Sequence, residues 1–133
     1  MPISLTIHDE LTYRVAGQAL EFVVSLPAER ISVRQLIEAR VQQEVEAFNA
    51  RRTEFFNGLV QPTGAEQTLN GFRLKQKRAI DAQEQCRKAL EAFERNGFIL
   101  LVDQRQAAGL DEVIEVSPQT QVTFLRLVPL VGG

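Results

Sequence analysis

The fold is decided by residues 31–48, which read ISVRQLIEARVQQEVEAF. Ser32 and Gln35 have the spacing of a capping box, in which each side chain bonds to the backbone N–H of the other residue. Ile31 and Leu36 stand at the positions of a hydrophobic staple around this cap. Apolar residues then recur at helical spacing, at Val33, Leu36, Ile37, Val41, Val45 and Phe48. Polar residues occupy the other side: Arg34, Glu38, Arg40, Gln42, Gln43 and Glu46. The pattern predicts a helix from residue 33 to about residue 50 with one apolar stripe.

Two stretches of alternating polarity precede this helix. Their apolar members are Ile3, Leu5 and Ile7, and then Leu20, Phe22, Val24 and Leu26. A period of two is typical of half-buried strands. We expect strands at about 3–8 and 19–26, joined as a hairpin by a long connection. A break is expected to begin at Asp9, and Pro27 ends the second strand because proline cannot donate to a ladder.

The character of the sequence changes over residues 51–96. Turn-forming residues from 57 to 71 predict a loop. Four apolar residues lie in it: Phe55, Phe56, Leu59 and Val60. We interpret them as packing the loop onto the rest of the protein, the alternative being an exposed apolar patch for a partner. Helical spacing returns from about 73 to 95, and Asn96-Gly97 predicts a left-handed stop.

The last third of the chain reads as strands separated by turns. We expect strands at 98–102, near 113–116 and at 121–128, with turns at 103–106 and 117–120. Apart from 51–96, the order is two strands, one helix and further strands. This order predicts a single α+β domain over residues 1–133, with one helix packed on a mixed sheet. The domain would carry a helical and loop insertion at about 51–96 and a C-terminal tail at 129–133.

Composition argues against several classes of function. The net charge is −2, so the chain has no basic excess for binding nucleic acid. One His and one Cys are too few for a His/Cys metal cluster within one chain. The sequence contains neither a Gly-rich phosphate loop nor a dinucleotide-binding motif. No apolar run approaches the roughly 18–20 residues of a membrane helix, and the first residues do not have the pattern of a signal peptide. We therefore expect a cytoplasmic protein without a cofactor.

The expected hairpin, the capped helix and the C-terminal strands that end in Gly-Gly resemble the ubiquitin-like β-grasp superfamily. The most specific part is the end of the chain, where LLVDQRQ at 100–106 and Leu110-Asp111 precede VTFLRLVPLVGG at 122–133. This tail is similar to that of ubiquitin-like modifiers and of the sulfur carriers of molybdopterin and thiamine synthesis. The resemblance covers about residues 1–50 and 97–133, but not 51–96. Pro129 is more like the sulfur carriers, whereas the insertion is unlike a compact sulfur carrier.

The resemblance implies a substrate and carrier rather than an enzyme. A bacterial-type ubiquitin-like modifier would be adenylated at Gly133 by an E1-like enzyme and conjugated to target proteins, with Gly132 helping the tail through a narrow channel. An E2-like enzyme and a deconjugating protease are further candidate partners. Partner contacts are expected at Arg126, Val128, Leu130 and Val131. Two alternatives stay open: a sulfur carrier that forms a C-terminal thiocarboxylate, and a non-covalent β-grasp interaction module whose diglycine is incidental.

Other reactive or charged residues have simpler interpretations. His8 lies at the end of the first strand, and we expect a surface histidine rather than a catalytic one. Cys86 lies on the apolar side of the second helix and is expected to be a small buried residue rather than a nucleophile. A basic cluster consists of Arg73, Lys75, Lys77 and Arg78. We interpret it as a solvated helix face, with docking of a partner protein as the alternative.

Overall fold

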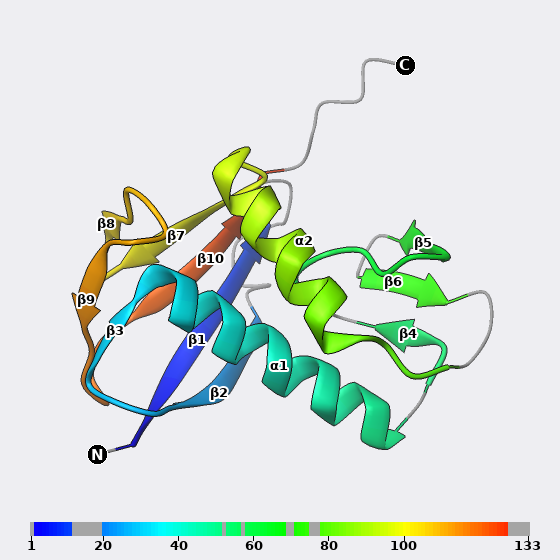
Figure 1. Ribbon diagram of the computed structural model, residues 1–133, viewed down its shortest axis with the longest axis horizontal. Coiled ribbons are helices and arrows are strands. Elements are labelled where there is room, and N and C mark those ends of the chain that lie inside the picture. Colours follow the sequence, from blue (N-terminus) through cyan, green and yellow to red (C-terminus); the bar gives the residue numbers. More distant parts are fainter. Residues whose placement is uncertain are drawn as a thin grey trace.

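A five-stranded mixed sheet with the order β2-β1-β10-β7-β8 forms the centre of the protein (Figure 1). The computed structural model describes residues 2–11, 20–51, 53–56, 58–68, 71–74 and 78–127. The strands of the main sheet are β1 (Ile3–Leu11), β2 (Leu20–Leu26), β7 (Phe98–Val102), β8 (Arg105–Gln106) and β10 (Val122–Arg126). β1 is antiparallel to β2 and parallel to β10, and β10 is antiparallel to β7. The expected α+β class with a mixed sheet is confirmed.

The first two strands form the expected hairpin, but β1 is longer than predicted. Asp9 pairs with Leu20 in the ladder, so the expected break at Asp9 is wrong. The alternating pattern does place its apolar members in the core, at Leu5, Ile7, Val24 and Leu26. Asp9 continues the inward-facing set of β1 and is only 5% exposed. A buried carboxylate needs a partner, and the partners of Asp9 are described below.

Helix α1 (Val33–Arg51) lies across one face of the main sheet (Figure 1). Its capping box is formed as predicted: the Gln35 amide donates to Ser32 Oγ at 3.1 Å, and the Ser32 amide donates to Gln35 Oε1 at 2.9 Å. The predicted apolar stripe is buried along its whole length. Arg40, which we expected on the polar side because it is charged, is buried as well, with an exposed fraction of 0%. That part of the prediction is wrong.

A two-stranded sheet supports the start of α1. It pairs β3 (Arg30–Ser32) with β9 (Val113–Glu115) in antiparallel fashion, which confirms the short strand expected near 113–116. The backbone amide of Arg34 donates to the carbonyl of Leu110 at 3.0 Å, so this part of the chain also holds the first turn of the helix.

Both predicted turns in the last third of the chain are present, but the first covers only residues 103–104, because Arg105 and Gln106 form β8. Asp103 and Gln104 have positive φ angles of 49° and 70°, and the chain returns as β8 directly afterwards. The backbone amide of Thr120 donates to the carbonyl of Ser117 at 3.0 Å, which closes the second turn.

The segment predicted to be a loop contains strands. A three-stranded sheet with the order β4-β6-β5 is formed by β4 (Phe55–Phe56), β5 (Ala65–Thr68) and β6 (Gly71–Leu74). Phe72 and Leu74 of β6 are buried, whereas Arg73 between them is exposed, so β6 has one inward face. The prediction of a loop is wrong because these strands are too short to give a periodic signal and gain stability only by pairing with one another.

The second helix, α2 (Ala82–Glu94), begins later than the predicted residue 73. Asp81 is its N-cap, and the carboxylate accepts a hydrogen bond from the Gln83 amide at 2.9 Å. Leu74, which was expected on this helix, belongs to β6. The predicted stop is present, with Asn96 in the left-handed conformation at a φ of 61°. The Gly97 amide then donates to the Ala92 carbonyl at 2.7 Å.

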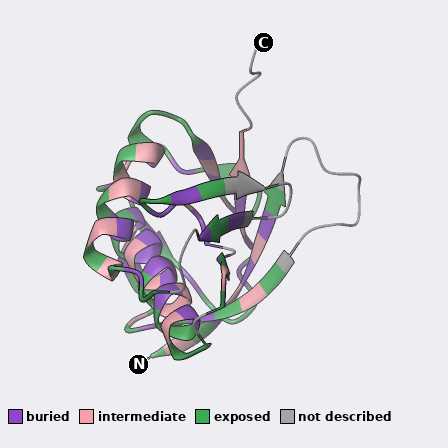
Figure 2. Ribbon diagram, turned by 90° about the vertical axis from the view of Figure 1, so that its right-hand side faces the viewer, coloured by how far each residue is buried: buried purple, intermediate pink, exposed green. Residues whose placement is uncertain are grey.

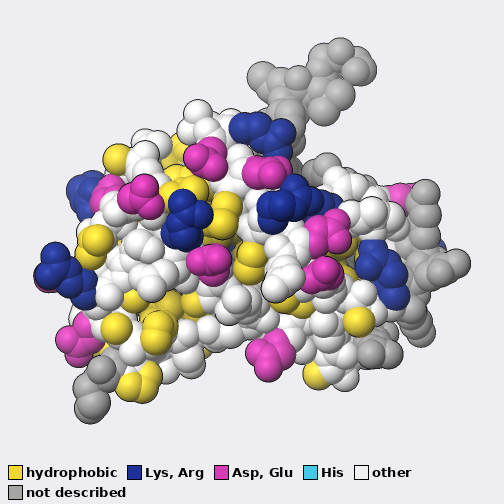
Figure 3. Space-filling view, in the orientation of Figure 1, with side chains coloured by type: hydrophobic (Ala, Val, Ile, Leu, Met, Phe, Trp, Pro, Cys, Tyr) yellow, Lys and Arg dark blue, Asp and Glu magenta, His cyan; other side chains and the backbone are white. Residues whose placement is uncertain are grey.

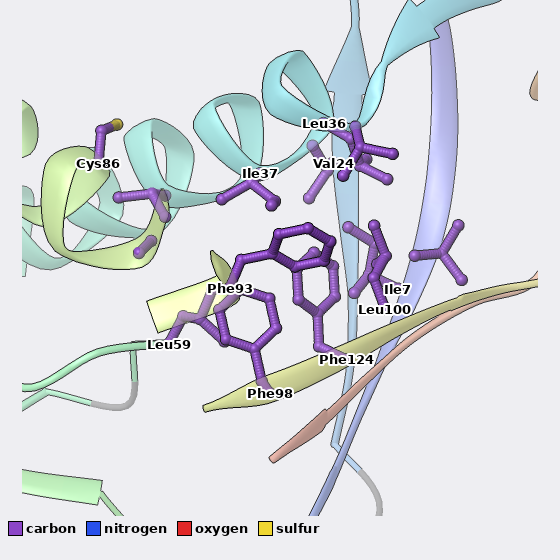
Figure 4. Close-up of a cluster of buried hydrophobic side chains, with 14 of the residues drawn as sticks. Ile7, Val24, Leu36, Ile37, Leu59, Cys86, Phe93, Phe98, Leu100 and Phe124 are labelled. Atoms are coloured by element: carbon purple, nitrogen blue, oxygen red, sulfur yellow. The ribbon is translucent and has the colours of Figure 1, made fainter. Parts of the chain in front are cut away.

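The main sheet, both helices and the insertion share one hydrophobic core. The insertion supplies several of its buried residues: Phe56, Leu59, Phe72, Leu74, Ile80, Cys86, Ala89 and Phe93. Ring contacts connect α2 to the main sheet. The centre of the Phe93 ring of α2 lies 5.7 Å from that of Phe98 of β7, and the Phe98 ring centre lies 5.7 Å from that of Phe124 of β10. Figure 4 shows Leu36 and Ile37 of α1 above this group of rings, and Figure 2 shows the buried positions gathered between the layers. The insertion is therefore packed as part of the same body.

Strand β2 lies at one edge of the main sheet and is partly covered by a side chain from α1. The Ser25 amide donates to Gln43 Oε1 at 2.9 Å, and Gln43 Nε2 donates to the Ser25 carbonyl at 2.7 Å. One side-chain amide thus pairs with both backbone groups of Ser25.

On the surface that carries the two helices, acidic and basic side chains are interspersed (Figure 3). This distribution agrees with the small net charge of −2. Within the part of the chain that the structure describes, neither helix combines the length and the apolar character needed to cross a membrane.

Candidate functional site

The predicted activation site falls largely outside the described residues. Gly132, Gly133, Val128, Leu130 and Val131 all lie beyond residue 127, where the description ends. The contacts predicted for them stay predictions.

Arg126 is the one predicted partner-contact residue that the structure describes. It is the last residue of β10, and its side chain is 19% exposed. Arg126 Nη2 donates to Asp9 Oδ2 at 3.2 Å and to the carbonyl oxygen of Gly58 at 2.9 Å. The guanidinium therefore binds groups within the protein, at the point where β10 ends. A contact between Arg126 and a partner stays a prediction. Only the exposed 19% of its side chain could make that contact.

Arg126 belongs to a charge cluster that also contains Glu44 and the buried residues Asp9 and Arg40. Arg40 Nη1 donates to Asp9 Oδ1 at 2.5 Å, and Arg40 Nη2 donates to Asp9 Oδ2 at 2.6 Å. Arg40 Nε donates to Glu44 Oε2 at 3.2 Å. Two carboxylates thus face two guanidinium groups, so the formal charges balance inside the cluster.

The cluster closes into a ring through one peptide group of the insertion. Glu44 Oε1 accepts a hydrogen bond from the Leu59 amide at 3.0 Å. The carbonyl of Gly58, which Arg126 binds at 2.9 Å, belongs to the same peptide group as that amide. The N–H and C=O of a trans peptide point in opposite directions, so Glu44 and Arg126 hold this group from its two sides. We call this closed set of hydrogen bonds the charge ring.

Aromatic side chains enclose the centre of the charge ring. The Arg40 guanidinium carbon lies 4.8 Å from the centre of the Phe22 ring and 4.5 Å from that of Phe124. Both distances are within the range of favourable cation–π contacts. Burial acts to lower the pKa of Arg40, but the carboxylates of Glu44 and Asp9 outweigh it and raise that pKa above its ordinary value. Arg40 stays charged.

For Glu44, the effect of burial on the pKa is larger than the effect of the groups around it. Its burial raises the pKa of the carboxyl above its ordinary value, and the Arg40 guanidinium and the Leu59 amide offset this effect only in part.

A cavity of about 440 Å³ adjoins the charge ring. Asp9, Arg40, Glu44 and Gly58 contribute to its wall, together with apolar residues of β2, α1 and β4. Asp9, Arg40 and Glu44 in this wall are bound to one another, whereas Glu21 and Arg51 also line it and are not part of the charge ring.

The remaining candidates have the simpler roles expected of them. His8 Nδ1 lies 3.4 Å from Glu21 Oε1 at the surface of the hairpin. Cys86 is buried, and its burial raises the pKa of the thiol to about 11. Within the described ranges, no three His, Cys, Asp or Glu side chains gather as a metal site would require.

The apolar residues of the insertion were expected either to pack onto the rest of the protein or to form an exposed patch, and the structure shows some of each. Phe56 and Leu59 are buried, which confirms that they pack the insertion onto the body, whereas Phe55 is 50% exposed. Arg73 lies on β6 and Arg78 precedes α2, so the expected helix face is wrong for these two residues. Lys75 and Lys77 lie outside the described residues.

No protein-family model matches this chain, and no curated protein or solved structure is similar enough to count as a match. Its own residues and their arrangement are the basis for the functional proposal.

Proposed function

We propose that this chain is a ubiquitin-like carrier of the β-grasp type, activated at Gly133 by an E1-like enzyme and conjugated to target proteins. The observation that supports this most is the position of β10. It lies between β1 and β7, pairs in parallel with β1, and leads towards the diglycine. An antiparallel hairpin, a helix across one face and a last strand returning beside the first are what the β-grasp resemblance requires.

The chemistry is that of a carboxylate acting as a substrate. A carboxylate oxygen of Gly133 attacks the α-phosphorus of ATP, a new P–O bond forms, and pyrophosphate leaves. A cysteine thiolate of the activating enzyme then attacks the acyl carbon, a C–S bond forms, and AMP leaves. Glycine suits a tail that must approach a nucleotide closely, because it has no Cβ.

Intact mass spectrometry of the protein isolated from its own host is the first test. It reports where the mature chain ends and which group is attached there. A conjugate through Gly133 is the expected result for a modifier. Replacement of a carboxyl oxygen by sulfur would identify a sulfur carrier instead.

ATP–pyrophosphate exchange with the cognate activating enzyme is the second test. Gly133→Ala is expected to unfold like the parent yet to be adenylated much more slowly. Deletion of Gly133 should abolish exchange, because the carboxylate would stop about 3–4 Å short, the length of one extended residue. Gly109→Ala is the matched control, since a Cβ there meets no atom within 4 Å. Full charging of the deletion variant would refute activation at Gly133, and a wild-type chain that is not charged at all would favour a non-covalent interaction module.

A further inference from the structure

We infer that the charge ring couples the insertion to the end of β10, so that Arg126 and Glu44 are positioning residues for the C-terminal segment. This inference rests on the proposed function, because it concerns how the diglycine segment is presented for activation. The sequence resemblance does not extend to the insertion.

One end of this coupling is the Gly58–Leu59 peptide group. It is held by two charged side chains, Glu44 from α1 and Arg126 from β10. Two residues after Gly58, the carbonyl of Val60 accepts a hydrogen bond from Gln85 Nε2 of α2 at 3.0 Å. Gly58 also has no room to take a side chain, since a Cβ there would overlap the ring of Phe56. This part of the insertion is thus fixed in position by three different elements.

The other end of the coupling is the last described stretch before the tail. The Arg126 side chain is fixed between Asp9 and Gly58, and the next backbone amide, that of Leu127, donates to the Gly97 carbonyl at 3.2 Å. A displacement of the Gly58–Leu59 peptide group removes one acceptor of Arg126. The change then reaches the residue from which the C-terminal segment leaves the sheet.

The hydrogen exchange of two backbone amides measures the stability of the two ends of this coupling, one in the insertion and one after β10. The Leu59 amide donates to Glu44, and the Leu127 amide donates to Gly97. No hydrogen bond described above joins Glu44 to Arg126 or Leu127, although the charges of Glu44 and Arg126 interact. A role of Glu44 confined to the insertion would affect the Leu59 amide alone. Coupling to the end of β10, through the hydrogen bonds of the charge ring and this charge interaction, would affect both amides.

Glu44→Gln is the variant that separates these cases. The carboxylate uses one oxygen for Leu59 and the other for Arg40 Nε. A glutamine has only one acceptor oxygen, so its NH₂ group must face one of these two donors. The shape of the side chain is kept while the ring is opened. Glu46→Gln, at an exposed position of the same helix, is the matched control.

Residue-resolved hydrogen exchange measured by NMR tests the coupling directly. The Leu5 amide, within the β1–β2 ladder, serves as the internal reference for global opening. In Glu44→Gln we expect exchange at Leu59 to rise about tenfold relative to Leu5, as loss of a charged hydrogen bond predicts. Exchange at Leu127 relative to Leu5 should rise as well, because its neighbour Arg126 loses part of its support. Glu46→Gln should change neither ratio. An unchanged ratio at Leu127 would overturn the inference, including the case in which all three amides rise together.

Activation kinetics test the consequence. With the cognate enzyme, Glu44→Gln should raise the apparent KM for the carrier several-fold and leave kcat unchanged, because Gly133 is intact. Wild-type chain that is not adenylated at all would refute the proposed function, while the exchange ratios would still decide the coupling. Adenylation of wild type with an unaltered KM for Glu44→Gln would overturn the positioning role.

Discussion

Asp9 of β1 and Arg40 of α1 form a two-point ion pair in the interior, with oxygen–nitrogen distances of 2.5 and 2.6 Å. The pair connects the first strand to the helix that covers it. Removal of one member of the pair would leave unequal numbers of positive and negative charges in the charge ring, and an unbalanced buried charge is costly.

Arg40→Leu is therefore expected to lower the free energy of unfolding by about 3–5 kcal/mol. The same substitution at Arg34 is the control. Arg34 lies on the surface of α1, and its Nη2 lies 3.8 Å from Asp111 Oδ1. Arg34→Leu should cost about 0–1 kcal/mol. Urea-induced unfolding measures both values, and equal losses would contradict the structural role assigned to the charge ring.

A second prediction concerns the fit of Gly58. A Cβ at this position would overlap the Phe56 ring, which is itself buried. Gly58→Ala should lower the free energy of unfolding by about 1–3 kcal/mol, as overpacking does. Gly109→Ala, where a Cβ meets open space, should stay within about 0.5 kcal/mol of the parent. Two variants with the same thermal midpoint would show that the ring of Phe56 does not occupy this space.

Leu36 tests how α1 packs on the sheet. Its side chain is inaccessible and belongs to the main core. Leu36→Ala should cost about 2–5 kcal/mol of unfolding free energy, including the cavity left behind. Gln42→Ala on the exposed side of the same helix should cost under about 0.5 kcal/mol. A loss below about 1 kcal/mol for Leu36→Ala would mean that this face does not lie on the sheet.

The thiol of Cys86 provides a pH-dependent prediction. Burial raises its pKa from 9.0 to about 11 in the folded protein. The folded state therefore binds more protons than the unfolded state between these values, so stability should fall as the pH rises from 9 to 11. At pH 8 the native thiol should react with iodoacetamide far more slowly than in urea, because only the thiolate is the nucleophile. Equal rates in both conditions would disprove the burial of this thiol.

Local signals in the sequence predicted the parts of the fold that depend on neighbours along the chain. The Ser32–Gln35 cap and the left-handed Asn96 both involve residues within one helical turn, and both are present in the structure. The alternation of β1 and β2 likewise appears directly in their burial. In contrast, β4, β5 and β6 are two to four residues long. Their pairing depends on contacts that no short window of sequence contains.

The charge ring escaped prediction for a related reason. Asp9 and Arg40 are separated by 31 positions in the sequence, so each reads alone as a polar residue. One signal was available, since Arg40 follows Leu36 and Ile37 by the spacing of one helical turn and therefore falls on the apolar stripe. A charged residue within an otherwise apolar stripe indicates a buried ion pair, although its partner has to come from the folded structure.

The pairing of Gln43 with Ser25 has a consequence for how molecules of this protein meet in solution. The outer edge of a sheet can recruit a strand from another chain, which leads to aggregation. At Ser25 the amide of Gln43 occupies both the donor and the acceptor of the β2 backbone. It stands where one peptide group of an incoming strand would bind. The helix that completes the core thus also protects the protein against unwanted self-association at this point of its edge.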